Sequence, residues 1–63
     1  MADYRVLIVD DTREVRRALV SAIETLDANI EIRDVPSGEE GLLELSSGPF
    51  DLLVSDVRLP GIS

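Results

Sequence analysis

The chain of 63 residues is long enough for one small domain, and it contains neither cysteine nor histidine, which excludes disulfide bonds and the usual structural zinc sites. Thirteen acidic residues against six arginines give a net charge of −7, which argues against direct contact with nucleic acid. No segment approaches the roughly 20 consecutive apolar residues of a membrane span, so we expect a soluble cytoplasmic protein with no membrane contact.

The first predicted element is a strand in the segment YRVLIVDD, residues 4–11. Its unbroken apolar core, Val6 to Val9, is typical of a parallel strand that is buried on both faces. A helix is predicted over residues 12–29, with Asp11 or Thr12 as its cap. Its apolar residues recur with helical spacing in one stripe, which consists of Val15, Ala18, Leu19, Ala22, Ile23 and Leu26.

Three further elements follow with short connections. Residues 30–35 predict a second strand, and residues 36–48 a short helix that begins at Ser37 or Gly38. We expect the apolar cover of this helix to come from its leucines, Leu42, Leu43 and Leu45. FDLLVSD, residues 50–56, predicts a third strand. Strands that alternate with helices indicate an α/β fold with a parallel sheet and right-handed crossovers. Further strands normally follow in such a sheet, so we expect residues 1–63 to be the N-terminal half of a domain of about 100–150 residues.

Acidic residues stand at the ends of two of these strands. Asp10 and Asp11 end the first strand, and Asp56 ends the third. Parallel strands present their carboxyl ends at one edge of the sheet, where ligands bind. A single aspartate such as Asp11 is ordinarily explained as a helix cap or turn former, but three at two strand ends are harder to explain as caps. Carboxylates that lie so near one another cannot all stay ionised without a cation. Mg²⁺ binds carboxylate oxygens, so the sequence predicts a Mg²⁺ site.

Three motifs together resemble the receiver domain of two-component response regulators: VLIVDD (6–11), SGEEGL (37–42) and SDVRLPGIS (55–63). The resemblance covers the N-terminal half of that domain, truncated after the third strand, and implies half of a flavodoxin-like (βα)₅ fold with sheet order 2-1-3-4-5. It implies that Asp56 is the phosphoacceptor and that Asp11 is a direct ligand of Mg²⁺ or Mn²⁺. Asp10 would act mainly through metal-bound water, and the backbone carbonyl of Arg58 would be the other protein ligand.

The resemblance also implies partners and leaves two alternatives open. A sensor histidine kinase or phosphotransfer protein would supply the phosphoryl group, and the receiver, a signalling module rather than an enzyme, would switch an attached output domain. The third strand would lie at an exposed edge of the sheet, which predicts a homodimer through that edge. One alternative is a truncated or engineered half-domain that self-assembles without signalling. The other is a Mg²⁺-dependent phosphatase of the haloacid dehalogenase type, with Asp10 as nucleophile, but that class requires an acid at position 12, where Thr12 stands.

Overall fold

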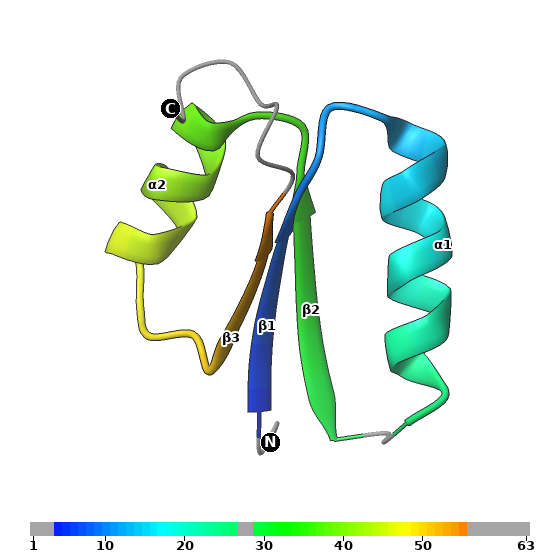
Figure 1. Cartoon of the computed structure of the whole chain (residues 1–63). Helices are drawn as coiled ribbons and strands as arrows, with labels where there is room; N and C mark the ends of the chain where they lie inside the picture. Colours follow the sequence, from blue (N-terminus) through cyan, green and yellow to red (C-terminus); the bar gives the residue numbers. More distant parts are fainter. Residues whose placement is uncertain (1–3, 27–28, 56–63) are drawn as a thin grey trace.

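The computed structural model describes residues 4–26 and 29–55, which form a three-layer α/β arrangement (Figure 1). Its elements, in chain order, are β1 (Tyr4–Val9), α1 (Arg13–Glu24), β2 (Ile30–Val35), α2 (Gly38–Ser46) and β3 (Leu52–Ser55). The three strands are parallel and lie in the order β2-β1-β3, with α1 on one face and α2 on the other. The predicted fold class and sheet order are confirmed. Neither of the two described helices has the length and apolar character needed to cross a membrane.

The central strand β1 carries the hydrophobic core of the described residues. The buried hydrophobic residues are the four that end this strand, Val6, Leu7, Ile8 and Val9. They pair with β2 on one side and with β3 on the other, because β1 lies between them. The continuous apolar run therefore marks a strand covered on both faces and both edges, as the sequence predicts.

Helix α1 packs on the sheet through a face that differs from the predicted stripe. No residue of α1 is buried, and its half-buried positions are Arg16, Leu19, Val20 and Ile23. Val15, a member of the predicted stripe, is 42% exposed. The prediction was therefore partly wrong. The reason is that α1 contacts β1 and β2 alone among the described elements, so only one side of its apolar surface reaches the sheet.

Helix α2 begins as predicted but covers the sheet in a different way. The Ser37 hydroxyl accepts a hydrogen bond from the backbone N–H of Glu40 at 3.3 Å, which caps the helix. The prediction that its leucines cover the sheet was wrong, because they are 41–69% exposed (Leu42, Leu43 and Leu45). The buried residues of α2 are Gly38 and Gly41. A Cβ atom on Gly41 would lie 2.9 Å from Cγ2 of Val9, so the helix backbone itself rests on β1.

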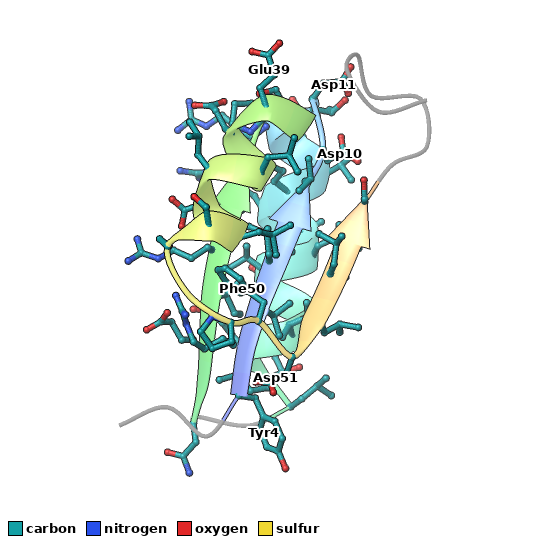
Figure 2. All side chains as sticks on the ribbon, turned by 90° about the vertical axis from the view of Figure 1, so that its left-hand side faces the viewer. Tyr4, Asp10, Asp11, Glu39, Phe50 and Asp51 are labelled. Atoms are coloured by element: carbon teal, nitrogen blue, oxygen red, sulfur yellow. The ribbon has the colours of Figure 1, made fainter. Side chains whose placement is uncertain are left out.

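Arg5 ties the loop before β3 to the central strand. Its guanidinium donates to the Pro49 carbonyl at 2.9 Å, pairs with Glu31 at 2.8 Å and lies 4.4 Å from the Phe50 ring centroid. The backbone N–H of Arg5 donates to the Asp51 carboxylate at 2.8 Å, and the Asp51 N–H donates to the Arg5 carbonyl at 2.7 Å. Phe50 and Asp51 therefore belong to this anchored loop (Figure 2), and β3 begins later in the chain than predicted.

The close contact between α2 and β1 gives a test of the packing. Gly41→Val should lower the free energy of unfolding by about 1–3 kcal/mol, because the new side chain meets the buried Val9. Leu43→Val, at a position 69% exposed on the same helix, is the matched control and should change it by less than about 0.5 kcal/mol. Urea denaturation followed by circular dichroism measures both variants. Equal stability of the two variants would contradict the glycine contact.

Candidate functional site at the carboxyl edge of the sheet

The two adjacent aspartates follow β1 at the edge where the parallel strands end. Figure 2 places Asp10 and Asp11 at this end of the molecule, opposite Tyr4 and Asp51. Glu39, in the first turn of α2, lies at the same end. Both helices begin at this edge, since each follows a strand that ends there. Ligands of open parallel sheets bind at such an edge, so it is the candidate site.

Asp10 is held in place by its own turn. It is only 8% exposed, and its Oδ1 accepts a hydrogen bond from the backbone N–H of Thr12 at 2.8 Å. Its backbone N–H donates to the carbonyl of Val35 at 3.1 Å, which continues the pairing with β2. The other carboxylate oxygen, Oδ2, accepts no hydrogen bond from the described residues. Asp10 therefore presents one engaged oxygen and one available oxygen at the strand end.

Asp11 and Thr12 follow Asp10 in the turn between β1 and α1. Asp11 is exposed, and its Oδ1 accepts a hydrogen bond from the Thr12 hydroxyl at 3.3 Å. Thr12 occupies the N-cap position of α1, but its side chain makes no capping hydrogen bond. The capping bond predicted for Asp11 or Thr12 is thus absent, and Asp10 engages the Thr12 N–H instead. This arrangement leaves the Asp11 carboxylate directed to solvent, where a cation could reach it.

Arg16 contacts the acidic edge, although nothing in the sequence indicated that it would lie there. Its Nη1 donates to the backbone carbonyl of Asp10 at 2.8 Å, and its Nε pairs with Oδ2 of Asp34 at 3.1 Å. The Arg16 side chain is only 13% exposed and its contact with Asp10 is partly buried, whereas Asp34 is 40% exposed. The predicted apolar stripe did not point to it, because Val20, the half-buried residue four positions later on the same side of α1, was not part of that stripe. Arg16 joins α1, the end of β1 and β2 in one polar network.

The remaining predicted site residues, Asp56 and the carbonyl donor Arg58, lie outside the described residues. Over residues 4–26 and 29–55, no group of three or more acidic, histidine or cysteine side chains could hold a metal ion. The strand register nevertheless relates the two strand ends. Val9 of β1 lies opposite Ser55 of β3, and these residues immediately precede Asp10 and Asp56 in the chain. The described half of the site therefore consists of Asp10 and Asp11.

Comparison with known proteins gives one match. A family model described as the response regulator receiver domain matches residues 6–63. That range includes most of β1, all the other described elements and the acidic edge. No curated protein and no solved structure matches the chain. The geometry of the acidic edge and this one family match therefore form the basis for assigning a function.

The Arg16 network can be tested by substitution. Arg16→Gln should lower the free energy of unfolding by about 1–3 kcal/mol, because the Asp10 carbonyl loses a partly buried charge-assisted partner. Arg13→Gln, at an exposed position on the same helix turn, should change it by less than about 0.5 kcal/mol. Thermal and urea unfolding would measure both. A neutral Arg16→Gln variant would show that the network contributes little to the fold.

Proposed function

The chain belongs to the response regulator receiver domain family, and on this basis we propose that it accepts a phosphoryl group on Asp56 from a sensor histidine kinase or phosphotransfer protein in the cytoplasm. Receivers are signalling modules of two-component systems. The observation that carries the proposal is the pair formed by a buried, hydrogen-bonded Asp10 and an exposed Asp11 at the carboxyl edge of the sheet. The register between Val9 and Ser55 supports a shared site, because it aligns the two strand ends that precede the acids.

The proposed site includes a divalent cation. We propose that Asp10, Asp11, Asp56 and the backbone carbonyl of Arg58 hold Mg²⁺ or Mn²⁺, with Asp10 acting mainly through bound water. Carboxylate and carbonyl oxygens are the ligands that Mg²⁺ prefers, and Asp10 and Asp11 supply two of them from adjacent positions. When bound, the cation would neutralise negative charge on the oxygens of the transferring phosphoryl group.

In the proposed phosphoryl transfer, Asp56 is the nucleophile. A carboxylate oxygen of Asp56 attacks the phosphorus of a phosphohistidine, the phosphorus–oxygen bond forms, and the phosphorus–nitrogen bond breaks with its electrons returning to the imidazole. Asp10 is a poor competitor for this attack, because it is buried and its Oδ1 is engaged by Thr12. Water later attacks the same phosphorus, which releases inorganic phosphate and restores the carboxylate. The cycle would switch an attached output domain.

A second part of the proposal concerns the edge strand β3. Neither described helix contacts β3, and Leu52 and Leu53 are 53% and 49% exposed. The strand order of the family places a fourth strand beside β3. The described sheet would therefore correspond to the N-terminal half of a receiver. The strand itself, Leu52–Ser55, contains no charged residue, so no like charges would face each other along a β3–β3 pair. We propose that a second copy of the chain pairs with this edge as a twofold dimer.

Phosphorylation gives the direct test of function. Incubation with acetyl phosphate and Mg²⁺ should add one phosphoryl group, which peptide mass spectrometry would locate on Asp56. Asp56→Asn should remove the label, and Glu39→Gln, an exposed acid at the same end of the molecule, should keep it. A label on Asp10 would instead support the phosphatase alternative. Absence of any label would support a self-assembling half-domain without signalling.

Metal binding gives an independent test. Asp11→Asn should weaken Mg²⁺ or Mn²⁺ binding by roughly ten-fold or more, because a neutral amide replaces a directly coordinating carboxylate. Glu39→Gln serves as the control for the general loss of one negative charge near this edge. Isothermal titration calorimetry with Mn²⁺ measures both variants. An affinity that does not change in Asp11→Asn would remove this residue from the ligand set.

The dimer is tested by sedimentation equilibrium of the 63-residue polypeptide. We expect a dimer at micromolar concentration, and a shift towards monomer in Leu53→Lys, because a charge on β3 opposes strand pairing. Leu26→Lys is the matched control, since Leu26 is 76% exposed and directly follows α1, a helix that does not contact β3. A stable, folded monomer of the unsubstituted chain would refute the dimer.

A further inference from the structure

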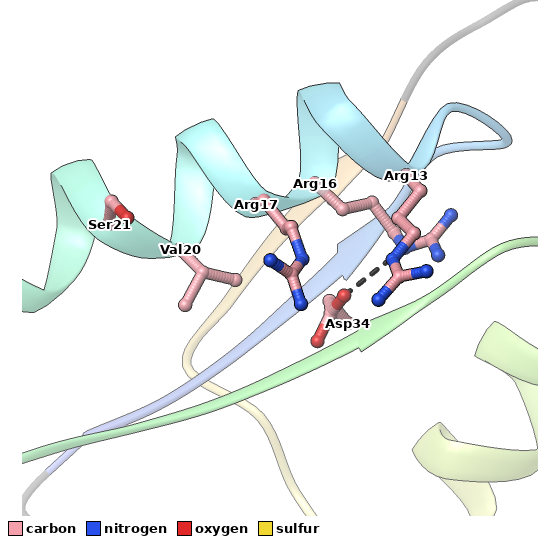
Figure 3. A pocket seen from close by; sticks show the side chains of 6 residues that line it. All are labelled: Arg13, Arg16, Arg17, Val20, Ser21 and Asp34. Atoms are coloured by element: carbon pink, nitrogen blue, oxygen red, sulfur yellow. Dashed lines mark hydrogen bonds and ion pairs between the residues drawn. The ribbon is translucent and has the colours of Figure 1, made fainter.

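A groove between α1 and β2 gathers positive charge on this acidic protein. We call it the arginine groove, and its lining residues are Arg13, Arg16, Arg17, Val20, Ser21 and Asp34 (Figure 3). All but Asp34 come from α1, and Figure 3 shows the three arginine side chains reaching towards Asp34 on β2. This groove lies on the sheet face opposite α2 and takes no part in the proposed phosphoryl transfer.

Two of the three arginines in the groove lack an ion-pair partner among the described residues. Arg16 pairs with Asp34 at 3.1 Å. Arg13 and Arg17 form no ion pair with any of the described residues, and both are exposed. They stand one helical turn apart, a spacing at which like charges repel each other. The groove therefore has an excess of positive charge on a chain whose net charge is −7, and an anionic partner would neutralise it.

The groove opens beside a second unsatisfied feature, the free edge of β2. Among the described strands, β2 pairs with β1 alone, so its other edge has no neighbour. The Val35 carbonyl accepts from Asp10 and therefore points to β1. Backbone groups alternate in direction along a strand, so those of Ile32 and Asp34 point away from the sheet. Such an edge is a template for another extended chain.

We propose that the arginine groove and the free β2 edge together bind an extended acidic segment of a partner polypeptide. The backbone of the segment would pair with Ile32 and Asp34 as an added strand, and its carboxylates would pair with Arg13 and Arg17. Val20 supplies an apolar contact about one helical turn beyond Arg17. This mode of recognition combines main-chain hydrogen bonds, which give affinity, with side-chain contacts at alternate residues, which give selectivity.

The spacing of the charges favours an extended polypeptide as the occupant. Residues four apart on a helix are separated by about 6 Å along its axis. Alternate residues on a strand are separated by about 6.6 Å and point to the same face. Acidic residues at every second position of an added strand would therefore meet Arg13 and Arg17 in step. A single phosphate ion would use the arginines but not the backbone of β2.

The test uses a synthetic peptide that alternates glutamate with valine, titrated into ¹⁵N-labelled protein and followed by NMR. We expect shifts of the Ile32 and Asp34 amides together with the side-chain Nε–H groups of Arg13 and Arg17. The double variant Arg13→Gln/Arg17→Gln should bind roughly ten-fold more weakly, because two charge pairs are lost. The same peptide with glutamine in place of glutamate should bind as weakly to the unsubstituted protein.

Arg33→Gln is the matched control. Arg33 lies on β2 but approaches Glu44 of α2, at 3.9 Å, so its loss should leave peptide binding unchanged. The proposal is overturned if the glutamine peptide binds equally well, or if Arg33→Gln weakens binding as much as the double variant does. It is also overturned if inorganic phosphate alone reproduces the whole pattern of shifts. Concentration-dependent shifts of the same groups without peptide would assign the edge to a second copy of the chain instead.

Discussion

Burial of β1 is the constraint on which the rest of this structure depends. The four residues from Val6 to Val9 are the buried apolar side chains of the described chain, and each contributes about 1.5–3 kcal/mol when fully removed from water. Every other element docks on this strand. β2 and β3 pair with its two edges, α1 lies against one face, and Gly41 brings the backbone of α2 against Val9 on the other. Loss of this contact surface would leave the helices with little to pack on.

The same constraint positions the acidic edge. Because β1 lies between its neighbours in register, its last residue, Val9, stands level with Val35 and Ser55. The next residue, Asp10, therefore lies at the edge where all three strands end. The hydrogen bond from Thr12 and the contact from Arg16 then hold Asp10 in one orientation. At the opposite end, Arg5 anchors the loop that leads into β3.

Much of this fold could be predicted from the sequence, because an unbroken apolar run such as Val6 to Val9 in a short chain indicates a buried central strand. The packing of α2 could not be predicted in this way. Its leucines are the most hydrophobic residues of the helix, so hydrophobicity predicts that they face the sheet. Instead, the small size of Gly41 lets the helix backbone approach β1, and the leucines are exposed. The apolar stripe of α1 is wider than the surface it can reach, so hydrophobicity alone did not identify the inward position of Arg16.

The candidate site was predicted in part. Adjacent acids at a strand end gave the location, but sequence alone could not tell which one is buried. Asp10 is buried because it still pairs with β2 through its backbone, whereas Asp11 has already left the sheet. The roles of Asp56 and Arg58 remain predictions, as do the cation and the dimer, because they depend on residues or partners beyond the described ranges.

The central claim is that the ends of β1 and β3 form one cation site, and paramagnetic relaxation by Mn²⁺ tests it most directly. In ¹⁵N-labelled protein, low Mn²⁺ should selectively broaden the amide signals of Asp10, Asp11, Ser55 and Asp56. The signals of Asp51, at the opposite end of the sheet, and of Arg5, which is hydrogen-bonded to Asp51, should remain sharp. Broadening that is centred on another acidic surface, or that spares Ser55 and Asp56 while affecting Asp10, would contradict the account.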